Sequence, residues 1–226
     1  EIEQVLALDS RPLSLPFRNV TAQRIDITTL PDAIFRDNQV TSVVHLAFQL
    51  KPGRGRRATE EVTKANLKGI EQVLKACRIA RATSLIFLSS HTVYGAHRNN
   101  PIPMTEEAKT NPHSGFQYAT DKTACEEIVL EFARENPEVT VTILRSCVVL
   151  GPAADNYVSR ALFKPLLLRV LGCDPPLQFV HEDDLSRLLH HLVMKPQSGI
   201  FNVAGEGIIP YSQVSRTASS RMLTVP

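Results

Sequence analysis

The sequence of 226 residues lacks the features that mark membrane proteins and secreted proteins. No apolar run approaches the ~20 residues that a membrane-spanning helix needs, and we find no signal peptide. The cysteines are few and widely spaced, with no CxxC pair: Cys77, Cys125, Cys147 and Cys173. Three of them fall in predicted core positions, so we expect reduced thiols that serve as apolar packing in a cytoplasmic protein. With no long apolar run, we expect no membrane partner.

A strong excess of charge of either sign is also missing. The formal net charge is +2, and no basic stripe alternates with aromatic side chains. We therefore expect no binding to nucleic acid. The length and the hydrophobic fraction of 43% fit one domain, or one domain with a small added lobe, around a sizeable core.

Segments of two kinds alternate along the chain: short apolar runs, and longer stretches whose apolar residues recur at helical spacing. Strands that alternate with helices predict an α/β fold, with a parallel sheet covered by helices on both faces. We expect strands over residues 3–8, 20–25, 41–47, 85–88, 139–144, 177–180 and 199–204, and helices over 58–80, over 116–135 and from an N-cap at Asp183.

Two stretches carry the groups on which a function can be built. The first, from Phe87 to Gly95, is an apolar strand that ends at a pair of serines, the second of which is Ser90. The other places the phenol of Tyr118 and the ammonium of Lys122 four residues apart, hence on one face of a helix. A hydroxyl, a phenol and an ammonium are the groups needed to move a proton on or off a carbinol oxygen while a hydride moves elsewhere.

These stretches, together with the segment from Leu144 to Pro152, resemble the short-chain dehydrogenase/reductase superfamily, specifically its extended, epimerase/dehydratase-like branch. The resemblance extends from about Val5 to about Pro226 and implies a Rossmann-like, doubly wound parallel sheet. Residues 1–151 would form an NAD-binding core, and residues 152–226 a substrate lobe plus core elements around 177–204.

One part of the family's pattern is absent. A dinucleotide-binding fold begins with a strand and a glycine-rich turn, and the pyrophosphate lies at the N-terminus of the next helix. No GxxGxxG or GxGxxG motif occurs here, and the pair Gly53 and Gly55 follows the wrong strand and lacks a third glycine. We expect that the sequence lacks the first strand, the glycine loop and the first helix of the core.

The resemblance assigns the catalytic roles to Ser90, Tyr118, Lys122 and Asn66. Tyr118 would be the general acid/base, its phenol pKa lowered from the usual ~10 by the Lys122 ammonium and a positive nicotinamide ring. Lys122 would also hold the nicotinamide ribose. Ser90 would donate to the substrate oxygen, with His91 beside it in the substrate pocket. Asn66, a polar residue on an apolar stripe, would support the active-site backbone, or alternatively would bond locally within its helix.

The resemblance also implies a cofactor. Asp9, at the end of the first strand of this sequence, matches the acid that binds the adenosine ribose hydroxyls, although an acid at a strand end is often a turn residue. Its charge would repel a ribose phosphate, so NAD is favoured over NADP, a preference that Arg11 slightly weakens. The other expected cofactor contacts are Asp26 and Ile27 at the adenine, Leu46 and Ala47 along a strand, and Cys147 and Val148 near the nicotinamide.

The implied function is that of an NAD-dependent oxidoreductase or epimerase acting on a secondary alcohol or ketone, either sugar-like or a small carbonyl compound. Nucleotide-sugar enzymes of the family carry an Arg-Asp-aromatic motif that grips the diphosphate, but residues 177–179 here are Leu-Gln-Phe. The short segment from Gly151 to Gln178 likewise leaves room for a smaller substrate. The alternative function is that of a non-catalytic NAD-binding regulator or scaffold with the same fold.

Two further expectations concern partners. The acid-rich stretch from His181 to Asp184 resembles a helix-capping segment of the family, so we expect no metal site there or elsewhere. Family members often pair through the helices that here hold Asn66 and Tyr118, so we expect a homodimer.

Overall fold

The computed structural model describes residues 2–13, 15–50, 55–154, 156–218 and 220–226. The chain divides into two compact units. The first comprises Glu1–Arg145 and Leu189–Phe201, and the second comprises Ser146–Leu188 and Asn202–Pro226. Within the described residues, no helix is both long enough and apolar enough to cross a membrane.

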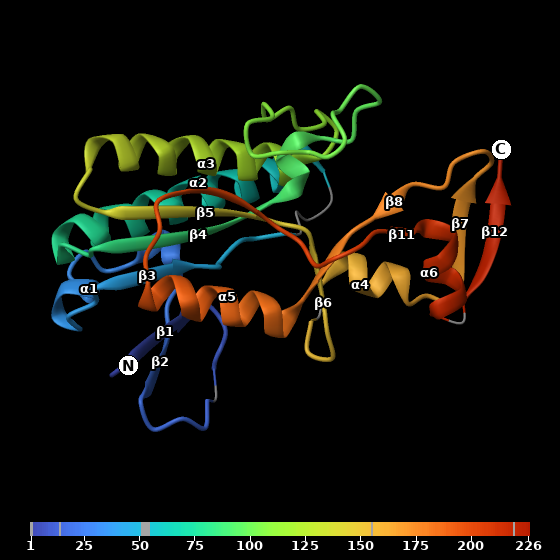
Figure 1. Cartoon of the computed structure of the whole chain (residues 1–226). Helices are drawn as coiled ribbons and strands as arrows, with labels where there is room; N and C mark the ends of the chain where they lie inside the picture. Colours follow the sequence, from blue (N-terminus) through green and yellow to red (C-terminus); the bar gives the residue numbers. More distant parts are fainter. Residues whose placement is uncertain (1, 14, 51–54, 155, 219) are drawn as a thin grey trace. The chain divides into compact units, whose positions relative to one another are not determined.

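The first unit is built on a four-stranded sheet with the strand order β10-β5-β4-β3 (Figure 1). Strands β3 and β4 run parallel, with Ser42 opposite Ser84 and His45 opposite Phe87. This arrangement confirms the predicted α/β class with a parallel, Rossmann-like sheet. The bounds of its strands are β3 Ser42–His45, β4 Ser84–Ser90, β5 Thr140–Ser146 and β10 Gly199–Val203.

A separate two-stranded sheet precedes this one along the chain. It pairs β1 (Val5–Asp9) with β2 (Val20–Arg24) in parallel. Within the described residues, no strand joins β1 or β2 to β3. The strands expected over residues 3–8 and 20–25 thus form a sheet of their own among the described residues.

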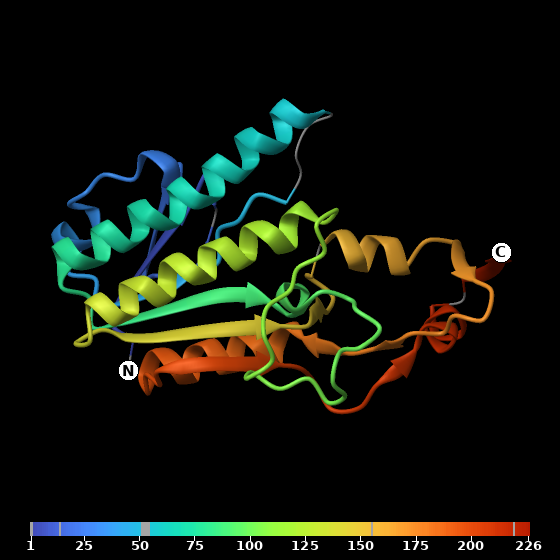
Figure 2. The same cartoon turned by 90° about the horizontal axis from the view of Figure 1, so that it is seen from above.

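Helices α2 (Arg56–Ala80) and α3 (Gln117–Glu135) lie side by side on one face of the main sheet (Figures 1 and 2). The part of α5 (Glu182–Met194) that belongs to the first unit lies on the other face. Both long helices present an apolar stripe to the sheet, as their sequence periodicity predicts. The buried residues of this core include Ile70, Val73, Leu74, Cys77, Leu85, Phe87, Cys125, Val129, Phe132 and Ile143.

Short elements complete the first unit: η1 (Ile27–Thr29), α1 (Ile34–Asp37) and η2 (His91–Tyr94). The prediction for α5 was wrong in one detail, because this helix begins at Glu182 and Asp183 lies inside its first turn. The backbone N–H of Asp183 donates to Nδ1 of His181 at 3.2 Å, so the histidine ring takes the capping contact expected of the acid.

The described residues of the second unit form three two-stranded sheets, the short helices α4 (Tyr157–Leu162) and α6 (Tyr211–Thr217), and the first part of α5. Asn156 and Ser159 form a capping box at the start of α4. The strand pairs are β6 (Val148–Leu150) with β9 (Phe179–His181), β7 (Leu166–Val170) with β12 (Arg221–Val225), and β8 (Pro176–Leu177) with β11 (Ile209–Pro210).

Candidate functional site

The two serines at the end of β4 have different surroundings, as alternation along a strand requires. Ser89 is buried, and its hydroxyl donates to the Glu126 carboxylate. Ser90 is the N-cap of η2, and its Oγ accepts from the backbone N–H of Thr92 at 3.3 Å and from the Thr92 hydroxyl at 3.0 Å. A hydroxyl that accepts these two bonds keeps its own proton available as a donor.

The turn that follows η2 requires glycine. Gly95 has a φ of 68°, and a Cβ placed there would lie 2.2 Å from the backbone oxygen of Asn111. The backbone N–H of Asn111 also donates to the Val93 oxygen at 2.8 Å. This close approach fixes η2, and with it the position of Ser90.

Tyr118 lies in the first turn of α3, half-buried between two aromatic rings. Its ring centroid is 5.4 Å from that of Phe48 in an edge contact, and 5.6 Å from that of Phe116. Burial raises the pKa of the phenol above its usual value, while a side-chain hydrogen bond with Ser90 lowers it in part. Desolvation of the phenolate outweighs the hydrogen bond, and the lowering expected from Lys122 together with a positive nicotinamide ring stays a prediction.

Lys122 lies one turn further along α3, with only 4% of its surface exposed. Its Nζ donates to the backbone oxygen of Leu88 at 2.7 Å and is 3.9 Å from the Phe48 ring centroid. Burial lowers the pKa of this ammonium to about 8, against the raising effects of Cys125 and Glu126. Most of the Lys122 side chains are therefore still charged at pH 7.

A neutral histidine lies behind this lysine. His45, at the end of β3, is buried and stacks on Phe87 with ring centroids 5.6 Å apart. Burial, with a smaller contribution from the charge of Lys122, lowers the pKa of His45 to about 3. The imidazole consequently adds no positive charge to the site near neutral pH.

Asn66 is buried in α2, and its amide bonds to residues far away in the sequence. Its Oδ1 accepts from the Gln49 N–H at 2.9 Å, and its Nδ2 donates to the Gln49 oxygen at 3.2 Å and to Oδ2 of Asp121 at 3.3 Å. The local hydrogen bond that we considered as an alternative is therefore not the one that satisfies this amide. Instead, Asn66 holds the backbone just past β3.

Asp121 was missed by sequence reasoning, although it directly precedes Lys122. Its buried carboxylate joins α3 to α2, where it accepts from the Thr63 hydroxyl at 2.9 Å and from the Asn66 amide. Within α3 it accepts from Nε2 of Gln117 at 2.8 Å. The sequence feature that could have identified Asp121 was its position, as an acid beside the buried face of an amphipathic helix.

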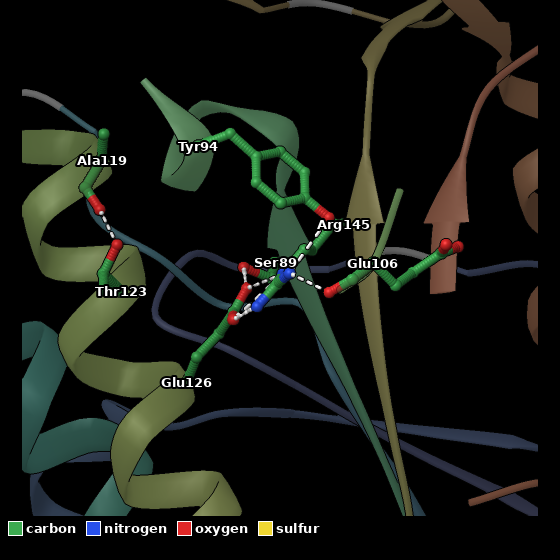
Figure 3. A network of polar contacts seen from close by, with 7 residues as sticks. All are labelled: Ser89, Tyr94, Glu106, Ala119, Thr123, Glu126 and Arg145. Atoms are coloured by element: carbon green, nitrogen blue, oxygen red, sulfur yellow. Dashed lines mark hydrogen bonds and ion pairs between the residues drawn. The ribbon is translucent and has the colours of Figure 1, made fainter. Parts of the chain in front are cut away.

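A buried ion pair lies next to Ser89 (Figure 3). NH2 of Arg145, from β5, donates to Oε2 of Glu126, from α3, at 2.7 Å, and both side chains are at most 4% exposed. NH1 of Arg145 donates to the Tyr94 hydroxyl at 3.0 Å and to the backbone oxygen of Glu106 at 3.3 Å. Sequence reasoning missed this pair too; its signal was a charge in each of two otherwise apolar core segments.

The residues expected at the adenosine, Asp9 and Asp26, are more exposed than those around Ser90, and they bond to near neighbours in the sequence. Asp9 lies at the C-terminal tip of β1, as predicted, and accepts from the Arg11 backbone N–H at 2.7 Å. Hydrogen bonds from Arg11 lower the pKa of Asp9 below its usual value. Asp26 caps η1 by accepting from the Thr28 N–H at 2.9 Å.

Packing and strand length decide the positions of the next three expected residues. Ile27 packs against α2 at Gly69, where an added Cβ would lie 2.5 Å from its Cδ1 atom. Leu46 and Ala47 are exposed, since β3 ends at His45 rather than at residue 47 as predicted.

The remaining expected residues lie near Ser90 or in the second unit. His91 is half-buried in η2, directly after Ser90. Cys147 and Val148 are half-buried at the start of the second unit, where the Cys147 N–H donates to the Val203 oxygen at 2.8 Å. Gln178, at the position of the acid in the family's Arg-Asp-aromatic motif, donates from Nε2 to the Gly205 oxygen at 2.9 Å. Among the described residues, no group of three His, Cys, Asp or Glu side chains is arranged to hold a metal ion.

Comparison with known proteins gives a family match and several relatives. The model of the NAD dependent epimerase/dehydratase family matches residues 2–204. The chain is 32% identical over 196 residues to an uncharacterized protein of Mycobacterium tuberculosis (strain ATCC 25618 / H37Rv), covering 85% of this chain and 51% of the relative. It is 34% identical over 122 residues to the UDP-glucose 4-epimerase of Pasteurella multocida (strain Pm70), covering 52% and 34%. The chain thus spans about half the length, or less, of these curated relatives.

Solved structures share the fold at lower identity. The UDP-glucose 4-epimerase of Thermotoga maritima, solved with UDP-glucose, has a TM-score of 0.79 at 20% identity, covering 99% of this chain and 78% of that chain. MoeE5 in complex with UDP-glucose and NAD has a TM-score of 0.78 at 23% identity, covering 96% and 73%. At these identities the likeness shows the fold alone.

Proposed function

The chain belongs to the NAD dependent epimerase/dehydratase family, and from this premise we propose that its protein is an NAD-dependent oxidoreductase or epimerase acting on a secondary alcohol or ketone of a sugar-like substrate. One observation carries the proposal: the Lys122 ammonium, one turn after Tyr118 on α3, donates at 2.7 Å to the backbone oxygen of Leu88, two residues before Ser90 on β4. A protein that only binds a dinucleotide has no need of this proton-transfer set.

Tyr118 is the proposed general acid/base. Its phenolate would take the proton of a substrate hydroxyl, and its phenol would return a proton to a carbonyl oxygen. Because burial alone raises the phenol pKa, the anion depends on positive charge at the site. Lys122 supplies one such charge, and its bond to the Leu88 oxygen holds it on the same helix face as Tyr118. Ser90 would donate to the substrate oxygen as charge develops there.

NAD is the proposed cofactor, and a nicotinamide ring would supply the hydride acceptor. The residues present fit part of such a cofactor. The Asp9 carboxylate stands at the tip of β1, where it could accept from ribose hydroxyls, and its charge disfavours the ribose phosphate of NADP. Asp26, Ile27, Leu46, Ala47, Cys147 and Val148 remain proposed contacts of this cofactor. The glycine-rich turn for the pyrophosphate is not among the 226 residues.

UDP-sugars are the first substrates to test, because two similar proteins carry the name UDP-glucose 4-epimerase. Residues 177–179, Leu-Gln-Phe, provide no arginine for a diphosphate, so smaller hydroxy or keto compounds form the second group to test. We also propose a cytoplasmic homodimer that pairs through α2 and α3. All four cysteines are free, which suits a reducing compartment.

The test compares a buried lysine, Lys122, with an exposed one, Lys75. The full-length protein is assayed with NAD and UDP-glucose for galactose epimer formation and for NADH absorbance. Lys122→Met removes the buried ammonium and is expected to lower kcat about 100-fold or more, the range of a lost acid–base partner. Lys75→Met, on the exposed face of α2 where Lys75 pairs with Asp32, is the matched control and is expected to keep wild-type turnover.

A wild-type protein that binds NAD but turns over neither UDP-glucose nor smaller hydroxy compounds would favour the non-catalytic alternative. Equal turnover in Lys122→Met and Lys75→Met would refute the catalytic assignment of Lys122.

A further inference from the structure

We propose that the buried Glu126–Arg145 ion pair is a positioning element of the catalytic site, which clamps the corner between β4 and η2 and so aims Ser90 at Tyr118. The kinetic part of this inference rests on the function proposed above. The structural part, the aim of the Ser90 hydroxyl, is independent of which substrate the enzyme uses.

The first half of the clamp connects the strand to the catalytic helix. Glu126 lies four residues after Lys122 and eight after Tyr118, so α3 presents all three on adjoining turns. The Ser89 hydroxyl donates to the Glu126 carboxylate, and the next residue, Ser90, lowers the pKa of the Tyr118 phenol. Strand β4 is thus tied to α3 through Ser89, directly beside the residue that acts on the phenol.

The second half of the clamp holds the other side of the corner. Arg145 comes from β5, the neighbour of β4 in the sheet. Its NH1 donates to the hydroxyl of Tyr94, the last residue of η2, which begins directly after Ser90 (Figure 3). The residues that flank the corner, Ser89 and Tyr94, are therefore bound to opposite members of one ion pair, and Ser90 lies between them.

Several hydrogen bonds join the two members of the pair, as a rigid support requires. Nε of Arg145 donates to both Glu126 oxygens, at 3.2 Å and 3.1 Å, and NH2 donates to Oε2. The fixed fork of a guanidinium holds a carboxylate in one orientation. Apolar residues of similar volume often stabilise a core as well as a buried ion pair does. An apolar pair could supply the same stability, but it could not fix the orientation of Ser90 at the corner.

Electrostatics point in the same direction. Burial lowers the pKa of Lys122 to about 8, and Cys125 and Glu126 are the neighbours that raise it. The carboxylate of Glu126 thus helps to keep the ammonium charged, in addition to holding Ser89.

The test uses Ser89→Ala, which cuts the link between the ion pair and the strand but leaves both charges in place. The protein is produced with fluorotyrosine, and the signal of residue 118 is assigned by its loss in Tyr118→Phe. Fluorine NMR then follows the phenol pKa. Because the hydrogen bond with Ser90 lowers this pKa, a misaimed Ser90 is expected to raise it. The kcat with NAD and UDP-glucose is expected to fall about tenfold at unchanged KM, the cost of about one lost hydrogen bond.

Ser84→Ala is the matched control. Ser84 is equally buried in the same strand and donates to the Ser42 hydroxyl at 2.8 Å, but it lies at the other end of β4. It is expected to lose comparable stability without a change in the Tyr118 pKa or in kcat.

The outcomes separate the two proposals. A Tyr118 pKa that rises in Ser89→Ala and not in Ser84→Ala supports the clamp, even if the wild-type protein proves inactive and the proposed function fails. A Tyr118 pKa that is the same in both variants and in wild type overturns the clamp, whatever the enzyme's activity.

Discussion

The charged residues at the tips of β1 and β2 differ physically from those around the end of β4. Asp9 pairs with Arg11, two residues away and 82% exposed, and Asp26 caps its own short helix. Glu126, Lys122 and Arg145 are buried and bond to residues 19 to 51 positions away. The first kind of site is a local arrangement that solvent screens, and the second exists only when three elements are packed together.

The comparison shows which charged side chains have positions that are fixed by packing. An exposed acid near a strand tip can change its side-chain conformation when a ligand binds. The buried ammonium of Lys122 and carboxylate of Glu126 cannot move independently, because each lost partner leaves an unsatisfied group in the core. The proposed catalytic end is therefore preorganised, whereas the proposed adenosine end is not.

The largest effect that would test this difference is on stability. Arg145→Met leaves the Glu126 carboxylate buried and unpaired, and is expected to lower the free energy of unfolding by about 3–5 kcal/mol. Arg11→Met removes the exposed partner of Asp9 and is expected to have no measurable effect. Urea denaturation of both variants measures the two free energies. Equal losses would remove the distinction between the two kinds of site.

The pH dependence of stability should follow the buried histidine. The folded-state pKa of His45 is lowered to about 3, below the ~6.5 of an unfolded chain. The unfolded state then binds more protons between these values, so stability falls as pH falls below ~6.5, by about 1.4 kcal/mol per unit of pH. His45→Gln should flatten this part of the pH profile in chemical denaturation. The exposed His191→Gln should not, and a profile unchanged by either would contradict the burial of a neutral His45.

The smallest effect is expected at the adenosine end. Asp9→Asn keeps the shape of the side chain but removes its charge. It should weaken NAD binding by about tenfold or less, the range of one hydrogen bond, and should weaken NADP binding less. Titration calorimetry with both dinucleotides measures the ratio. An unchanged ratio of NAD to NADP affinity would show that Asp9 does not face the ribose.

Sequence patterns predicted the elements that have strong periodicity. The α/β order, the helix face shared by Tyr118 and Lys122, and the strand that ends at the serines all follow from spacings of two or four residues. The ends of elements were less certain. β3 stops at His45 because the following backbone is held by Asn66, a contact across 17 residues.

Contacts between distant segments could not be predicted from the sequence. Nothing in the order of residues says that the arginine of β5 meets the glutamate of α3, or that Asp121 joins α3 to Thr63 and Asn66 of α2. The burial of Tyr118, which raises the pKa of its phenol, could not be predicted for the same reason. The number of residues from Tyr118 to Lys122 was visible in the sequence, but the burial of the phenol was not.

The hydroxyl of Tyr118 is the single group on which the proposed chemistry depends, and the most direct measurement compares Tyr118→Phe with wild type in the full-length protein. We expect kcat with NAD and a turned-over sugar to fall by about 10²–10⁴-fold, the contribution of a general acid/base, while the Kd for NAD stays within about twofold. Wild-type turnover in this variant would contradict the account.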